Sequence, residues 1–94
     1  MGKRFSLKAT VSSKNESAIR PALKSLIAKG TVKEEAGEFV VEAEMEGINS
    51  RDLNRDLLSA LRKIEKRTTL RAEWTSGKTT DRYFDYALKK TFKI

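Results

Sequence analysis

The chain of 94 residues contains no cysteine and no histidine, and it has a single proline and a single tryptophan. Without cysteine there is no disulfide framework, thiolate nucleophile or zinc ribbon. Without histidine the chain lacks the most common general base and metal ligand, and with it the Ser-His-Asp triad. No apolar run approaches the roughly 18 residues of a transmembrane helix, and no signal peptide is recognisable. These absences predict a cytoplasmic, non-enzymatic protein with no catalytic residue, no metal, no other cofactor and no membrane partner.

The composition fits one small domain over residues 1–94. The chain is 38% hydrophobic and 35% charged, which is typical of a folded protein with a highly charged surface. A chain of this length buries only about two-thirds of its unfolded surface, so its core must be small.

Charge is unevenly distributed along the sequence. The net charge of +7 divides into a basic block over residues 1–30, an acidic block over residues 31–50 and a second basic block over residues 51–94. A polyanion would be attracted by the two outer blocks and repelled by the middle one. The alternative is a solvated, ion-paired surface.

Hydrophobic periodicity predicts most of the elements. Residues 4–11 alternate as a half-buried strand, and a helical stripe then begins near Ser17 and ends at Gly30, with Pro21 at its start or at a kink. Strands over 31–36 and 39–46 flank Gly37 as a hairpin. A strongly amphipathic helix covers 51–66, and a further strand covers 68–75. The tail, residues 79–94, fits a helix that buries Phe84, Ala87 and Leu88 or a strand, and we favour the helix.

This element order predicts an α+β protein. The order β-α-β-β-α-β is the ferredoxin-like split βαβ arrangement, a four-stranded antiparallel sheet with two helices on one face, here followed by a C-terminal helix. The core would combine the two helical stripes with the strand residues Phe5, Leu7, Val41, Leu70 and Trp74.

The long helix presents a basic ridge opposite its apolar stripe. At about 100° per residue, three arginines and one lysine fall close together, and guanidinium groups pair well with phosphate oxygens. The predicted nucleic-acid-binding residues are Arg51, Arg55, Arg62 and Lys66, with Lys14, Lys89, Lys90 and Lys93 as auxiliary phosphate contacts. The alternative is the ordinary solvated face of an amphipathic helix.

Two other binding modes are less well supported. An RNA-recognition motif needs exposed aromatic residues on its central strands, and the stretch from Glu35 to Glu42 keeps only Phe39 and Val40 in step. No GXXG loop of the KH type is present.

The row Glu42, Glu44 and Glu46 could hold a hard cation or work as a general acid and base, but we favour cross-strand pairing with Lys8 and Arg71.

Two resemblances add to this interpretation. Leu70-Arg71-Ala72-Glu73-Trp74-Thr75 followed by Asp81-Arg82-Tyr83-Phe84-Asp85-Tyr86 resembles a small family of uncharacterised archaeal proteins, which implies no assigned activity. Residues 5–66, with Gly37-Glu38-Phe39-Val40-Val41 leading into a helix rich in leucine and arginine, resemble the Pcc1-type subunit of the KEOPS tRNA-modification complex. That resemblance implies a non-catalytic dimerising scaffold, and it transfers no residue role.

The sequence therefore supports two hypotheses of different kinds. The first is a small non-enzymatic binding module that contacts RNA or DNA phosphates through the basic helix face. The second is a protein-interaction or dimerisation subunit of a larger complex, which would use an open sheet edge or the aromatic tail to bind a partner or a second copy.

Overall fold

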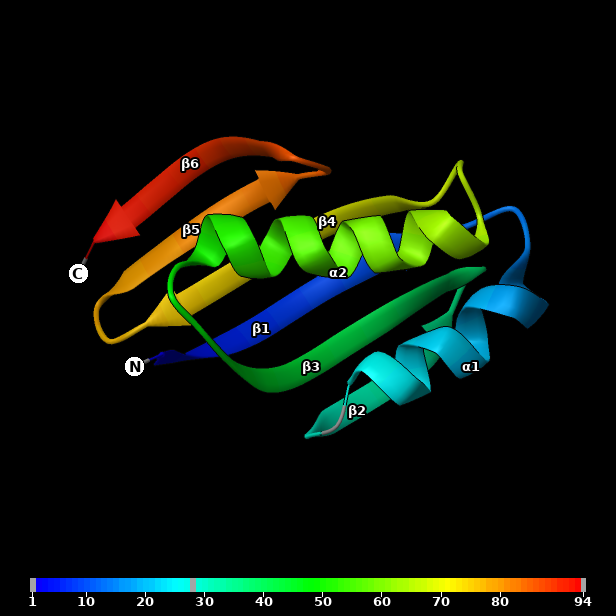
Figure 1. Ribbon diagram of the computed structural model, residues 1–94, viewed down its shortest axis with the longest axis horizontal. Coiled ribbons are helices and arrows are strands. Elements are labelled where there is room, and N and C mark those ends of the chain that lie inside the picture. Colours follow the sequence, from blue (N-terminus) through cyan, green and yellow to red (C-terminus); the bar gives the residue numbers. More distant parts are fainter. Residues whose placement is uncertain (1, 28, 94) are drawn as a thin grey trace.

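The protein is an α+β structure in which two helices cover one face of a six-stranded antiparallel sheet (Figure 1). The computed structural model describes residues 2–27 and 29–93. The elements in chain order are β1 (Lys3–Ser12), α1 (Glu16–Leu26), β2 (Gly30–Glu35), β3 (Glu38–Gly47), α2 (Ser50–Ile64), β4 (Thr69–Ser76), β5 (Thr79–Phe84) and β6 (Ala87–Lys93). In the sheet, the strands follow the order β2-β3-β1-β4-β5-β6.

This architecture corrects the fold predicted from the sequence. The predicted four-stranded ferredoxin-like sheet with a C-terminal helix is wrong, because the sheet has six strands and the tail forms β5 and β6. Phe84, Ala87 and Leu88, which the predicted helix would bury, are all exposed, and Tyr83 is the buried residue among positions 79–93 that the structure describes. Residue 94, the last of the predicted helix, lies outside the described residues.

A tight turn explains why the tail forms strands. Asp85 adopts a left-handed backbone with φ of 55°, which aspartate tolerates better than most residues. Its amide donates to the Leu70 carbonyl oxygen at 2.7 Å, and its carboxylate accepts from the Leu70 amide at 2.9 Å. The chain can therefore reverse between β5 and β6 without a glycine.

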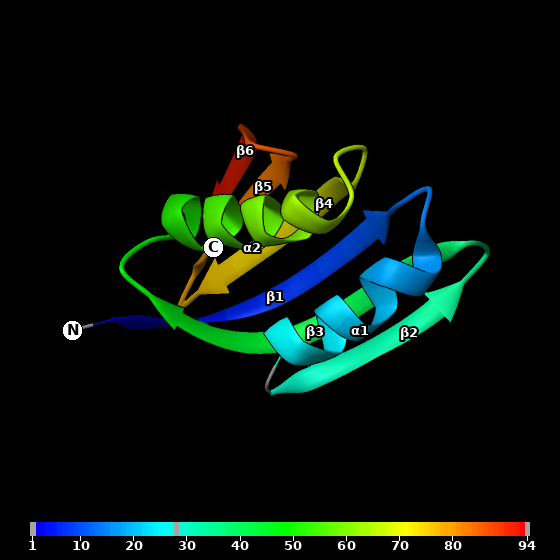
Figure 2. The same ribbon diagram turned by 45° about the vertical axis from the view of Figure 1, so that its right-hand side comes forward.

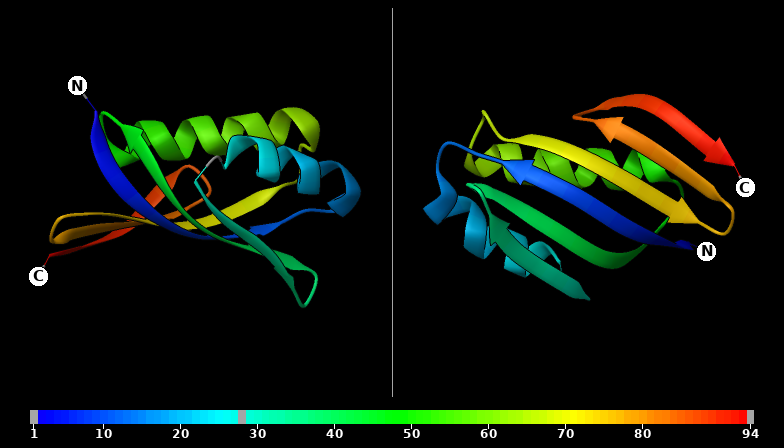
Figure 3. Two further views of the ribbon diagram at one scale, coloured as in Figure 1. Left: turned by 90° about the horizontal axis from the view of Figure 1, so that it is seen from below. Right: turned by 180° about the vertical axis from the view of Figure 1, so that it is seen from behind.

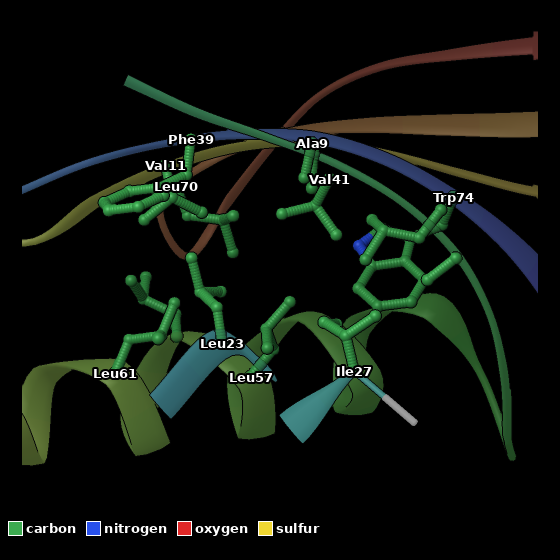
Figure 4. Packing of buried hydrophobic residues seen from close by; sticks show 14 of the residues in the cluster. Ala9, Val11, Leu23, Ile27, Phe39, Val41, Leu57, Leu61, Leu70 and Trp74 are labelled. Atoms are coloured by element: carbon green, nitrogen blue, oxygen red, sulfur yellow. The ribbon is translucent and has the colours of Figure 1, made fainter. Parts of the chain in front are cut away.

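The core lies between the sheet and the helices. Strand β1 is central and pairs with both β3 and β4, which places Leu7 opposite Ala43 and Trp74, and Val11 opposite Phe39 and Leu70. Alternate residues of these strands face Leu23 of α1 and the Leu57–Leu61 face of α2 (Figure 4). The predicted core residues Phe5, Leu7, Val41, Leu70 and Trp74 are all buried.

Each helix begins at an asparagine cap. Asn15 accepts a hydrogen bond from the Ala18 amide at 3.3 Å, and Asn49 accepts one from the Asp52 amide at 2.8 Å. Helix α1 ends at Leu26 rather than at Gly30, which instead begins β2. Gly30 lies so close to β3 that a Cβ atom would meet the Glu42 carbonyl oxygen and would lie 2.6 Å from the Ala43 Cα.

The helices cover one face of the sheet and leave the other uncovered. Both helices lie on one side of the curled sheet (Figure 2), and the view from behind shows the strands with no helix in front of them (Figure 3, right). We call this second surface the open face. Strand β6 forms one edge of the sheet, beyond the cover of the helices (Figure 1).

Candidate nucleic-acid interface

The first two residues of the predicted ridge are exposed on α2. Arg51 lies in the first turn, and Arg55 lies one turn later. Arg55 pairs with Asp52 and with Asp56, each at 3.3 Å. Because two carboxylates compete for this guanidinium, it offers a phosphate less than a free arginine would.

Arg62, the third residue of the predicted ridge, is held by contacts within the fold. Its Nε donates to the Thr68 carbonyl oxygen at 3.0 Å, and its Nη2 lies 3.3 Å from Oδ2 of Asp85. Its guanidinium also lies over the Tyr86 ring, 5.2 Å from the centroid. The side chain is only 31% exposed. Arg62 therefore joins the end of α2 to the β5–β6 turn, which leaves the predicted ridge interrupted at this position.

Lys66 and Lys14, by contrast, belong to two loops that contact each other. Lys66 is in the turn after α2, and Lys14 is in the loop between β1 and α1. These two loops meet where Oγ1 of Thr68 lies 3.5 Å from Oγ of Ser13. Exposed Lys63 and Arg67 lie in the same stretch of chain. We call Lys14, Lys63, Lys66 and Arg67 the basic end of the molecule.

The predicted lysines of the tail form no continuation of this surface. Lys89, Lys90 and Lys93 are exposed on β6, which ends on the side of the molecule away from the end of α2 (Figure 1). Lys90 is paired with Arg82 on the open face, whereas Lys93 is paired with Thr79 and is on the opposite face. The structure therefore divides the predicted residues among the outer face of α2, the basic end and both faces of β6.

Sequence reasoning missed Lys63 and Arg67. Both belong to the run Arg62-Lys63-Ile64-Glu65-Lys66-Arg67, whose charge density was the available signal. It also missed Arg82 as a surface cation of the open face, because the strand that carries Arg82 was predicted to be a helix. Arg71 was expected on that face, as a partner of the acidic row.

The acidic row of β3 lies on the open face. Glu42 pairs in register with Lys8, as predicted, and Lys8 is also opposite Glu73 of β4. Arg71 instead faces Thr10 and Phe84, and Glu46 forms an exposed ion pair with Arg4 at 3.8 Å. A depression of about 390 Å³ lies on this face. It is lined by acidic and basic side chains and by Val40, but not by Glu44. This arrangement agrees with cross-strand pairing.

One ion pair on the helix side alters the titration of its partners. Arg20 of α1 donates to the carboxylate of Glu34 in β2. This hydrogen bond holds the pKa of Glu34 below its ordinary value and raises the pKa of Arg20. The pair joins α1 to the edge strand β2, so we assign it a structural role.

Comparisons with known proteins give no identity. No protein-family model, curated protein or solved structure matches the chain. The resemblances to the archaeal family and to the Pcc1-type subunit therefore stay predictions. Within residues 2–27 and 29–93, no group of three or more acidic side chains is placed to hold a metal ion. Neither helix of the described chain is long and apolar enough to cross a membrane.

Proposed function

We propose that the protein is a cytoplasmic, non-enzymatic module that binds nucleic acid through its phosphates. The observation that carries this proposal is the basic end, where the loop before α1 meets the loop after α2, so that Lys14 is joined by Lys66 and Arg67 and by Lys63 of the last turn of α2. None of the ion pairs among the described residues includes any of these four side chains. Exposed cations that are not neutralised by neighbouring carboxylates are suited to bind phosphate oxygens.

The helix adds to this electrostatic field. Exposed Arg51 extends the positive charge to the start of α2. Arg55 contributes when it leaves its carboxylate partners and binds a phosphate instead. Glu42, Glu44 and Glu46 of β3 lie on the open face rather than on the outer surface of α2, whereas Glu38 of the same strand accepts a hydrogen bond from Ser12, two residues before Lys14. The proposal therefore moves the main contact from the middle of the predicted ridge to its C-terminal end.

Fluorescence anisotropy with end-labelled oligonucleotides tests this function. At low ionic strength the protein is expected to bind single-stranded RNA, single-stranded DNA and duplex DNA, with an affinity that falls steeply as salt is added. The double variant Lys66→Ala/Arg67→Ala should bind all three more weakly. The matched control is Lys33→Ala/Lys78→Ala, which removes the same charge from sites outside the basic end. Absence of binding to every polynucleotide at low salt would refute the proposal.

The second hypothesis, self-association, is favoured by one observation. Strand β6 is an open sheet edge, and Leu88 on it is 51% exposed. However, three lysines on this strand oppose pairing with an identical edge, a common way in which proteins protect open edges. Sedimentation at high micromolar concentration distinguishes the hypotheses: a stable dimer would favour the dimerisation subunit.

A further inference from the structure

Two aromatic side chains lie on the open face of the outer strands. Phe84 of β5 is opposite Arg71, and Phe92 of β6 is opposite Thr80, so both rings are on the side of the sheet away from the helices. Phe84 is 41% exposed, and Phe92 is partly exposed. Tyr83, the neighbour of Phe84, points to the other side and is buried. The open face therefore has apolar rings that the core does not use.

At least one cation lies over each ring. The guanidinium of Arg71 lies 5.5 Å from the centroid of Phe84, and that of Arg82 lies 5.0 Å from the centroid of Phe92. The ammonium of Lys90 lies 4.8 Å from the Phe92 centroid. Both Nε and Nη2 of Arg82 donate to Oε2 of Glu73, at 2.9 and 2.7 Å, and these two hydrogen bonds fix its guanidinium on the open face. Neither Arg71 nor Lys90 belongs to an ion pair of the described chain.

Charge divides the open face into two halves. Strand β3 presents Glu42, Glu44 and Glu46 there, whereas strands β4 to β6 present three cations against Glu73. An anionic chain would therefore be directed to the half that contains the rings. Alternating cations and aromatic rings provide what a single-stranded polynucleotide requires, since its phosphates need positive charge and its unpaired bases stack on aromatic faces.

The aromatic half of the open face is also near the basic end. Arg67 and Arg71 are four residues apart in the sequence, so at most about 14 Å of extended chain separates them. Phe92 is opposite Thr80, which precedes Phe84 by four residues in β5, so the two rings are separated along the strands by roughly 13 Å. A strand bound at the basic end could therefore continue past Phe84 to Phe92.

We propose that Phe84 and Phe92, with Arg71, Arg82 and Lys90, form a platform on which the protein stacks bases of a single-stranded polynucleotide. This inference rests on the proposed function and gives it a substrate class. Bases in a duplex already stack on one another and do not expose their faces, so the platform selects single strands. The phosphates of the same strand contact Arg71 and Lys90, which belong to no ion pair of the described chain, while Glu73 holds Arg82 in place over Phe92.

The test compares a 12-nucleotide oligouridine, a 12-nucleotide oligothymidine and a 12-base-pair DNA duplex by fluorescence anisotropy. The variant Phe84→Leu/Phe92→Leu keeps apolar side chains but removes the aromatic faces. We expect it to bind both single strands at least about tenfold more weakly, because stacking contributes substantially for each base, and to bind the duplex as the wild type does. The variant Lys66→Ala/Arg67→Ala should weaken binding to all three probes.

The possible outcomes distinguish failure of the platform from failure of the proposed function. If the wild type binds polynucleotides and the phenylalanine variant binds the single strands equally well, the platform is refuted and the proposed function stands. If the wild type binds no probe, both are refuted. If the phenylalanine variant instead changes a dimer into a monomer without altering oligonucleotide binding, the face is an interface between copies and the platform is refuted.

A measurement on the wild type guards against a variant that fails to fold. Aromatic NMR spectra recorded during titration with oligouridine should show ring-proton shifts of Phe84 and Phe92, because a stacked base alters their magnetic environment. The buried ring of Trp74 is the internal control and should not shift. Unchanged phenylalanine resonances at saturation would refute the platform.

Discussion

The indole Nε1 of Trp74 donates a hydrogen bond to Oδ1 of Asn54 at 3.1 Å, and both side chains are almost completely buried. The amide nitrogen of Asn54 in turn donates to the carbonyl oxygen of Asp85 at 2.6 Å. One side chain of α2 thus satisfies polar groups of β4 and of the turn between β5 and β6. It links the terminal hairpin to the core.

Replacing Asn54 should therefore be costly. Asn54→Leu keeps the volume but leaves the indole N–H and the Asp85 carbonyl without partners, and we expect a loss of about 2–4 kcal/mol in the free energy of unfolding. Urea denaturation followed by Trp74 fluorescence measures it. Ser59→Ala, which removes an exposed hydrogen bond to Tyr86 from the same helix, should change stability by less than about 0.5 kcal/mol. Equal effects of the two substitutions would contradict the buried link.

Two arginines of α2 should respond differently to truncation. Arg62→Ala removes the contacts with Thr68, Asp85 and Tyr86, and we expect it to lower stability by about 1–2 kcal/mol. Arg55→Ala breaks only exposed ion pairs and should change stability by at most about 0.5 kcal/mol. Thermal unfolding of both variants provides the comparison. If Arg62→Ala does not change stability, Arg62 is a surface cation without a structural role.

Gly30 and Gly77 provide a test of backbone packing. Gly30→Ala places a Cβ against the backbone of β3, so we expect a loss of about 1–3 kcal/mol from overpacking. Gly77 has φ of 60°, and apart from Gly77 and its two chain neighbours no atom of the described residues lies within 4 Å of the position that a Cβ would take there. Gly77→Asn should therefore stay within about 0.5 kcal/mol, since asparagine tolerates this conformation. Chemical denaturation of the two variants measures both changes. A large loss at Gly30 alone would show that glycine is required there for space, whereas at Gly77 only the backbone conformation matters.

The ion pair of Arg20 and Glu34 should give a small pH dependence. The folded-state pKa of Glu34 is depressed by the hydrogen bond from Arg20, so its contribution to stability is present above the unfolded-state pKa and is lost as the pH falls through the folded-state value. Glu34→Gln should therefore reduce the difference in stability between pH 7 and pH 3. Because the pair is exposed, added salt should diminish this effect. An identical pH profile for the variant would show that the pair contributes nothing.

Salt dependence provides a quantitative test of the basic end. Each phosphate contact to a single strand contributes about −0.7 to the slope of log K against log salt concentration, so Lys66→Ala/Arg67→Ala should make that slope shallower by about 1.4. Anisotropy titrations at several salt concentrations measure the slope. A weaker affinity with an unchanged slope would indicate a structural effect rather than lost phosphate contacts.

Local patterns were sufficient to predict the elements that have a clear period. The alternation of β1, the stripe of α2 and the hairpin at Gly37 all agree with the structure, and so does the burial of Trp74. The prediction of a helix for the tail is wrong because Phe84, Ala87 and Leu88 have helical spacing, while the turn that separates two strands there is formed by Asp85 without a glycine.

The candidate site was harder to predict because its members depend on long-range contacts. A helical wheel places Arg62 beside Arg55 and Lys66, but it contains no information about Asp85, which comes from the tail and binds Arg62. Likewise, it cannot show that the loops carrying Lys14 and Lys66 contact each other. The exposure of the two phenylalanines of the platform depends on the register of β4, β5 and β6.

The central position of β1 has a consequence for how the chain folds. Lys8 pairs with Glu42 on one side and with Glu73 on the other, so the first strand completes its pairing only after most of the chain is available. Such non-local pairing slows folding, because a long loop must close before the contacts form. During synthesis, the N-terminal strand would leave the ribosome well before its second neighbour, and until β4 emerges it would expose an unpaired edge.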